Sequence, residues 1–180
     1  PDSSLTLQYL SGPRQINLLN TGDMTLNFWN ANGLASGSTQ GGGTGTWTAT
    51  NSVWTDATGS VTAPMNPNPG FAIFAGDAGT VTVSDVDGAV EAQGLQFASD
   101  GYVLTGDALT LTGPDGEIRV GDGSAASSGY QATVANVISG NSGLMKTGEG
   151  TLILSGLNNY VGDTVISAGT LHAVADEALG

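Results

Sequence analysis

Cysteine is absent from this 180-residue sequence, and basic residues are scarce. Without cysteine there are no disulfides, no thiolate metal sites and no cysteine nucleophile. Three basic residues stand against sixteen acidic ones, which gives a net charge of −13. A chain with this charge repels nucleic acid and anionic membranes, so we expect no nucleic-acid partner. We expect most of the acidic residues to serve solubility.

Long apolar runs are also missing. No stretch approaches the roughly 20 residues of a membrane-spanning helix, and the first ten residues, PDSSLTLQYL, lack the pattern of a signal peptide. No stretch has convincing helical spacing, and the nearest, Ala132–Ile138, fits a strand equally well. The sequence therefore gives no support for membrane-spanning or helical folds.

Glycine, by contrast, is abundant. The sequence has 29 glycines and only 11% charged residues, with threonine, serine and valine in short alternating segments. This composition favours many short strands joined by tight turns. We therefore predict an all-β chain.

One short unit occurs twice near the end of the sequence. Gly150-Thr151-Leu152 returns as Gly169-Thr170-Leu171, 19 residues later. Between the two copies lie glycines and the pair Asn158-Asn159, which predict turns because both residue types tolerate positive φ. A period near twenty residues, made of a short strand plus turns, is typical of a solenoid. Each coil of a solenoid buries its apolar face against the next, so we expect Leu152, Leu154 and Leu171 to point inward.

The same stretch resembles the passenger-associated repeat of bacterial autotransporters. The resemblance rests on the glycines, leucines and lysine of GLMKTGEGTLILSG (143–156) and on NNYVGDTVISAGTL (158–171). The family often has Asn-Thr-Tyr-Thr-Gly-Gly-Thr where this chain has the turn sequence NNYVGDT. The resemblance implies a right-handed parallel β-helix that is exported through the periplasm and outer membrane to the surface of a Gram-negative cell. It also implies that the export signal and an outer-membrane barrel lie outside this segment.

Three regions follow from the spacing of strand and turn signals. Residues 1–28 and 71–180 are predicted to form β-helix coils, and the second region includes the repeat at 143–174. Residues 29–70 hold all three tryptophans, three of the six prolines and the small-residue stretch Ser36–Gly43. We interpret this block as an irregular excursion from the solenoid or a junction between two stacks of coils.

One pairing is left open by the sequence. Leu109–Thr112 and Glu117–Val120 flank a Gly-Pro-Asp-Gly turn, and they form either two sides of a coil or an antiparallel hairpin. In either arrangement Ile118 and Val120 alternate inward. Glu117 and Arg119 then share the outer face, where a weak ion pair between them is expected.

The tryptophans are the candidate ligand-binding residues. Trp29, Trp47 and Trp54 lie in a loop-rich block, where exposed aromatic rings stack on sugars or anchor a protein partner. The alternative is that the three rings fold back and seal apolar surface at the end or side of the solenoid.

No catalytic, cofactor or metal site is predicted. His172 is the single histidine and alternates with the inward Leu171, so we expect it to face solvent. The close acidic pairs Asp85/Asp87 and Asp115/Glu117 lie in or beside turns, where aspartate bonds to nearby backbone. Neither the EF-hand spacing nor a calcium-binding nonapeptide repeat occurs.

These observations favour a non-catalytic stalk or adhesin-type segment of an autotransporter passenger. Its expected partners are a host surface protein or glycan, or another passenger. The alternative is a carbohydrate-binding or carbohydrate-cleaving β-helix, which clustered acids beside Arg or Lys would favour. We also expect the coil that ends at Gly180 to fray or to associate end to end, more so as salt rises or pH falls toward the isoelectric point.

Overall fold

The computed structural model describes residues 5–10, 15–33 and 41–180. Arg14 and residues 34–40, most of the small-residue stretch, lie outside these ranges. Within them the regular elements are strands, apart from the short 3-10 helix η1 (Ala125–Gly129). No helix in the described ranges is long and apolar enough to cross a membrane. The prediction of an all-β chain is confirmed.

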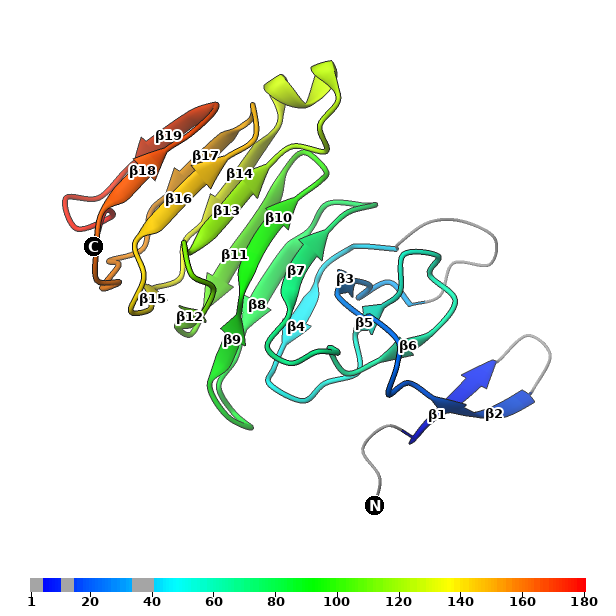
Figure 1. Cartoon of the computed structure of the whole chain (residues 1–180). Coiled ribbons are helices and arrows are strands. Elements are labelled where there is room, and N and C mark those ends of the chain that lie inside the picture. Colours follow the sequence, from blue (N-terminus) through cyan, green and yellow to red (C-terminus); the bar gives the residue numbers. More distant parts are fainter. Residues whose placement is uncertain (1–4, 11–14, 34–40) are drawn as a thin grey trace.

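From residue 71 onward the chain winds through three parallel sheets in turn (Figure 1). We call one such passage a coil. The first sheet contains β7 (Phe71–Phe74), β10 (Gly94–Phe97), β13 (Glu117–Val120), β16 (Leu144–Thr147) and β18 (Thr164–Ile166). The second contains β8 (Thr80–Val83), β11 (Tyr102–Gly106), β14 (Gln131–Val134), β17 (Thr151–Leu154) and β19 (Thr170–Ala173). The third contains β9 (Val90–Ala92), β12 (Leu109–Leu111) and β15 (Ile138–Ser139).

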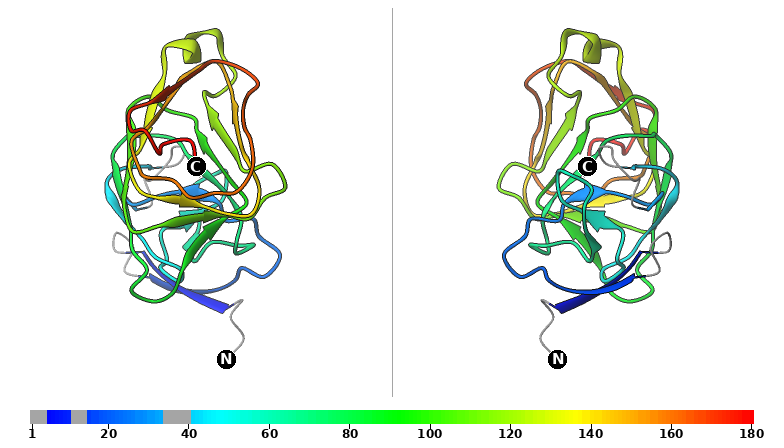
Figure 2. Two further views of the ribbon diagram at one scale, coloured as in Figure 1. Left: turned by 90° about the vertical axis from the view of Figure 1, so that its left-hand side faces the viewer. Right: turned by 90° about the vertical axis from the view of Figure 1, so that its right-hand side faces the viewer.

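Each strand pairs with the strand one coil away. The repeated unit shows this directly, because Thr151 pairs with Thr170 and Leu152 with Leu171. Figure 2, which views the stack from its ends, shows successive coils lying over one another. This arrangement is the one expected of a solenoid.

The open pairing at residues 109–120 is also settled. β12 pairs in parallel with β9 and β15, whereas β13 pairs in parallel with β10 and β16. The two strands belong to different sheets, so they are two sides of a coil and not a hairpin.

Alternation places apolar residues inside the stack. Ile118 and Val120 are fully buried, as are Leu152 and Leu154. Leu171 is half-buried and packs against the same core, because it lies in the last described coil and is covered from one side. The inward assignment of the repeat leucines is therefore confirmed.

The first strands differ from the prediction. Residues 1–28 were expected to form coils, but β1 (Leu5–Leu10) and β2 (Gln15–Asn20) pair with each other in an antiparallel hairpin. The two strands form a sheet of their own. Period-2 alternation is shared by hairpins and coils, so the alternation of these two strands does not tell one arrangement from the other.

The block from 29 to 70 closes one end of the stack. β3 (Phe28–Trp29) continues the first sheet beside β7, and β4 (Gly45–Trp47) continues the second sheet beside β8. β5 (Trp54–Thr55) and β6 (Thr62–Ala63) then add to β3 in antiparallel pairing. Parallel stacking thus changes to antiparallel pairing at this end (Figure 1).

The inward leucines give a direct test of the core. Leu152→Asp should lower the free energy of unfolding by about 3–5 kcal/mol, because it places an unpaired carboxylate in a fully buried position. Urea melts followed by circular dichroism measure this loss. Ser155→Asp, an exposed change just beyond the same strand, should leave the midpoint unchanged. Equal midpoints for both variants would contradict the inward assignment.

Candidate functional site

The three tryptophans form a buried aromatic cluster. Trp29, Trp47 and Trp54 have exposed fractions of 0%, 2% and 1%. Trp54 lies edge-on between the other two, with ring centroids 5.4 Å from Trp29 and 5.0 Å from Trp47. Phe74 of β7 joins the cluster, with its centroid 6.1 Å from that of Trp54. The rings are therefore not available to stack on a sugar or to anchor a partner.

The cluster instead seals the end of the core. The indole N–H of Trp29 donates to the carbonyl of Gly43 at 2.8 Å, so its one polar group is satisfied inside the protein. Phe74 stacks on Phe97 of the next coil at 5.2 Å, which continues the aromatic core into the stack. The expectation that the tryptophans bind ligand does not fit this geometry, whereas the alternative that they cover apolar surface does. The sequence signal for the fourth ring was the inward alternation of Ala72 and Phe74.

In the first acidic pair, the carboxylate of Asp87 accepts hydrogen bonds from the same protein. Asp87 accepts hydrogen bonds from the hydroxyls of Thr48 and Thr50, at 2.9 and 2.7 Å, and from the N–H of Ala49. These hydroxyls hold the pKa of Asp87 below its usual range. The carboxylate therefore joins the end block to the turn after β8, which is a structural role.

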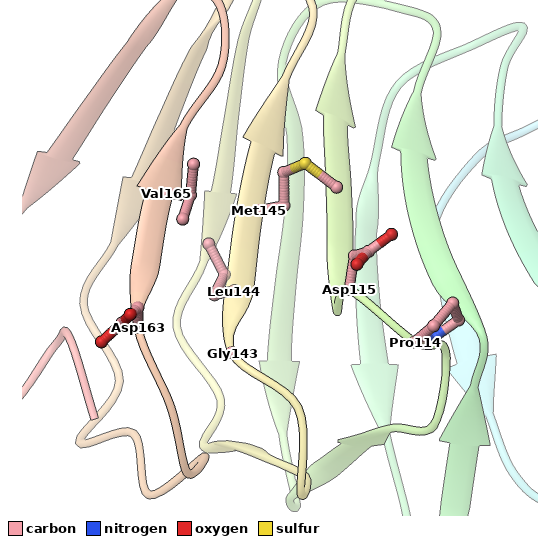
Figure 3. Close-up of a pocket in the computed structure, with 7 residues that line it drawn as sticks. All are labelled: Pro114, Asp115, Gly143, Leu144, Met145, Asp163 and Val165. Carbon is pink, nitrogen blue, oxygen red and sulfur yellow. The ribbon is translucent and has the colours of Figure 1, made fainter.

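The two residues of the second acidic pair, Asp115 and Glu117, have different surroundings. Glu117 accepts a hydrogen bond from the Thr147 hydroxyl at 2.6 Å, and no ion pair between Glu117 and Arg119 forms among the described residues. The prediction of a weak ion pair between Glu117 and Arg119 is therefore wrong. Asp115 instead lies at a shallow pocket of about 230 Å³ on the outer side of the first sheet. Figure 3 shows Asp115 and Asp163 at this pocket, with Met145 on the strand between them.

The histidine faces outward, as predicted. His172 is exposed on β19, beside Ile153 of the preceding coil. Over residues 5–10, 15–33 and 41–180, no three His, Asp or Glu side chains lie close enough together to hold a metal ion.

Lys146 is a buried cation whose inward position was not predicted from the sequence. It is fully buried, and it pairs in register with the buried Ile118 of one adjacent coil and with Ile166 of the other. Its ammonium donates to the carbonyls of Thr147 and Gly148 at 2.6 and 2.7 Å, and to that of Ala168 at 3.1 Å. One side chain thus ties the turn after β16 to the equivalent turn after β18. Its alternation with Leu144 was the available signal.

Burial also changes the titration of this lysine. Loss of hydration lowers the pKa of Lys146 from 10.5 to about 8. The neighbouring Arg119 guanidinium acts in the same direction, and the Glu149 carboxylate opposes both.

Replacement of this lysine should loosen the repeat. Lys146→Met should lower the free energy of unfolding at pH 7 by about 1–3 kcal/mol, because three carbonyls lose their donor. The pKa is lower in the folded chain, so the unfolded chain binds more protons between about pH 8 and 10.5. The contribution of this group to parent stability therefore rises with pH across that window.

Urea melts of the parent and of Lys146→Met at pH 7, 9 and 10 measure both effects. The free energy of unfolding of the variant should lack this rise with pH. The contributions of the other titrating groups cancel when the two proteins are compared. Parallel pH profiles would show that Lys146 does not titrate in this window.

Comparison with known proteins places this geometry in a family. Residues 144–173 match the model of the passenger-associated-transport-repeat. The chain is also 48% identical over 168 residues to the adhesin BmaC autotransporter of Brucella suis biovar 1 (strain 1330). That alignment covers 92% of this chain and 5% of the relative, so the chain spans a small part of that protein's length. No solved structure matches the chain.

The two matches agree with the structure. The matched repeat contains β16, β17, β18 and β19, together with the buried Lys146. The similarity to the adhesin extends far beyond that repeat. The repeat and the similarity to the adhesin identify the chain as a fragment of an autotransporter passenger, a kind of segment that is transported through the outer membrane to the cell surface.

Proposed function

We propose that the chain is a non-catalytic length of passenger stalk, a right-handed parallel β-helix that presents binding surface outside the cell. In this proposal residues 71–180 form the body of the helix, and the block 29–70 closes its end. The observation that carries the proposal is the continuous in-register stacking of parallel strands from β7 to β19. Such a stack is rigid along its axis and offers long flat sides.

The distribution of residues supports a presenting role. Most inward positions are apolar and buried, with Lys146 the charged exception, so the outer positions of each strand contribute little to the core. Outward residues can therefore differ from coil to coil without disturbing the stack. The net charge of −13 keeps such a surface soluble.

The name of the relative favours adhesion over catalysis. In this chain Asp87 and Glu117, one member of each acidic pair, accept hydrogen bonds from nearby threonines, and His172 is exposed on β19. We infer that the partner is a host surface protein or glycan, or a second passenger. The barrel that anchors such a passenger belongs to another part of the protein.

Adhesion can be measured with the chain itself. Beads coated with the purified chain should be retained on cultured mammalian cells more than beads coated with the Leu152→Asp variant, measured in urea just sufficient to unfold the variant and not the parent. A folded chain is needed because the outer residues are held in register by the coils. Equal retention of both bead types would overturn the adhesive role.

Catalysis is tested separately. We expect the purified chain to leave uronic-acid and neutral polysaccharides intact, with or without added calcium, as measured by the release of reducing ends. Turnover that disappears when a single acidic residue is replaced would contradict the non-catalytic assignment.

A further inference from the structure

Two of the three basic residues meet at one turn of the stack. Lys146 points inward from β16, and Arg119 lies on the outer face of β13, paired in register with Thr147. The Arg119 guanidinium is near enough to help lower the pKa of Lys146. Glu117, Asp122 and Glu149 also lie near these two cations, so whether Arg119 is paired with one of them decides whether it is available.

Arg119 has no anionic partner within the described residues. Glu117, on the same face, is bound to the Thr147 hydroxyl at 2.6 Å. Asp122, in the turn that follows β13, accepts from the N–H of Ser124 at 2.8 Å. The Nε of Arg119 is buried and makes no hydrogen bond to the described residues. A guanidinium left unpaired in so acidic a protein is poised to accept a carboxylate from outside.

Two glycines lie against the side chain of Arg119. A Cβ on Gly148, where φ is +72°, would lie 3.1 Å from the Cγ of Arg119. A Cβ on Gly123, where φ is +92°, would lie 3.5 Å from its Nη2. The arginine therefore lies against glycine backbone, and the burial of its Nε restricts the side chain. A restricted guanidinium loses less entropy when it binds an anion.

The strands beside Arg119 supply an amide and an aromatic ring. Gln96 pairs in register with Arg119, and its amide nitrogen donates to the carbonyl of Gly121 at 2.9 Å. Phe71 of β7 is half-buried, and its ring lies across Gly94, where a Cβ would be 2.5 Å from the phenyl carbon Cε2. Strand spacing puts Phe71 about 12 Å from Arg119 along a diagonal of the sheet. The three side chains come from consecutive coils on one flat face.

We propose that this face, formed by β7, β10 and β13, binds a glycan that carries a single carboxylate. Arg119 pairs with the carboxylate, Gln96 hydrogen-bonds sugar hydroxyls, and the ring of Phe71 stacks on a neighbouring sugar. The net charge of −13 repels a polyanion, which favours one acidic sugar over a sulfated polymer. This inference rests on the proposed surface-presenting function and names its ligand class.

Titration with 3′-sialyllactose and with lactose tests the proposal, since the two probes differ by the acidic sugar. In calorimetry or NMR at low salt, the parent chain should bind sialyllactose about tenfold more tightly than lactose. Arg119→Gln should remove this difference, and Arg119→Lys should retain part of it because lysine keeps the charge without the planar fork. Phe71→Leu should weaken the binding of both sugars. Thermal melts confirm that each variant is folded.

Several results would overturn the proposal. These are equal binding of both sugars, absence of binding, or a carboxylate preference that survives Arg119→Gln. Binding of a glutamate-rich peptide in place of sialyllactose would assign the face to a protein ligand. Retention of parent beads on cells with no sialyllactose binding would leave the adhesive function standing and reject this ligand. Sialyllactose binding without bead retention would support this ligand and reject the adhesive function.

Discussion

The structure depends on one constraint, which is that a single coil cannot bury its own apolar face. Most of the strands from β7 to β17 bury only two side chains each, and these are covered by the neighbouring coils. In-register parallel pairing satisfies both the backbone groups and the core at once, because it places like positions over one another. A slip of one residue would turn every inward side chain outward, so register and core are fixed together. The buried Lys146 obeys the same rule, since its ammonium reaches carbonyls in its own coil and the next.

The block of residues 29–70, which contains the three tryptophans, closes one end of the stack. A parallel stack leaves an apolar cross-section at its end, and strands β5 and β6 cover that region with antiparallel pairing and large rings. Each indole buries a large apolar area, so three of them cover such a surface with few residues. This is why all three tryptophans lie in one part of the sequence. The rings belong to the end of the core and not to a recognition loop.

Much of this fold could be predicted from the sequence, and the failures have physical causes. The repeat was visible because Gly-Thr-Leu returns at a fixed spacing, and the inward set followed from alternation. The hairpin β1–β2 was predicted as coils because alternation describes one strand and says nothing of its partner. Lys146 was overlooked because charge argues for solvent exposure, and only the carbonyls of two turns, brought together by folding, make its burial tolerable. The weak pair of Glu117 and Arg119 failed because Thr147 from the next coil competes for the carboxylate.

Lys146 and Arg119 show how the stack separates structure from surface. The two residues lie on adjacent strands at neighbouring register positions, but alternation sends one inward and the other outward. The inward cation is bonded to three carbonyls and holds two coils together, so it is not free to bind anything else. The outward cation makes no such bonds within the described residues, and its stem rests on glycine backbone. A side chain that adds little to the core can change without loss of the fold, and therefore the outer positions, taken coil by coil, are where passengers with one scaffold can acquire different ligands.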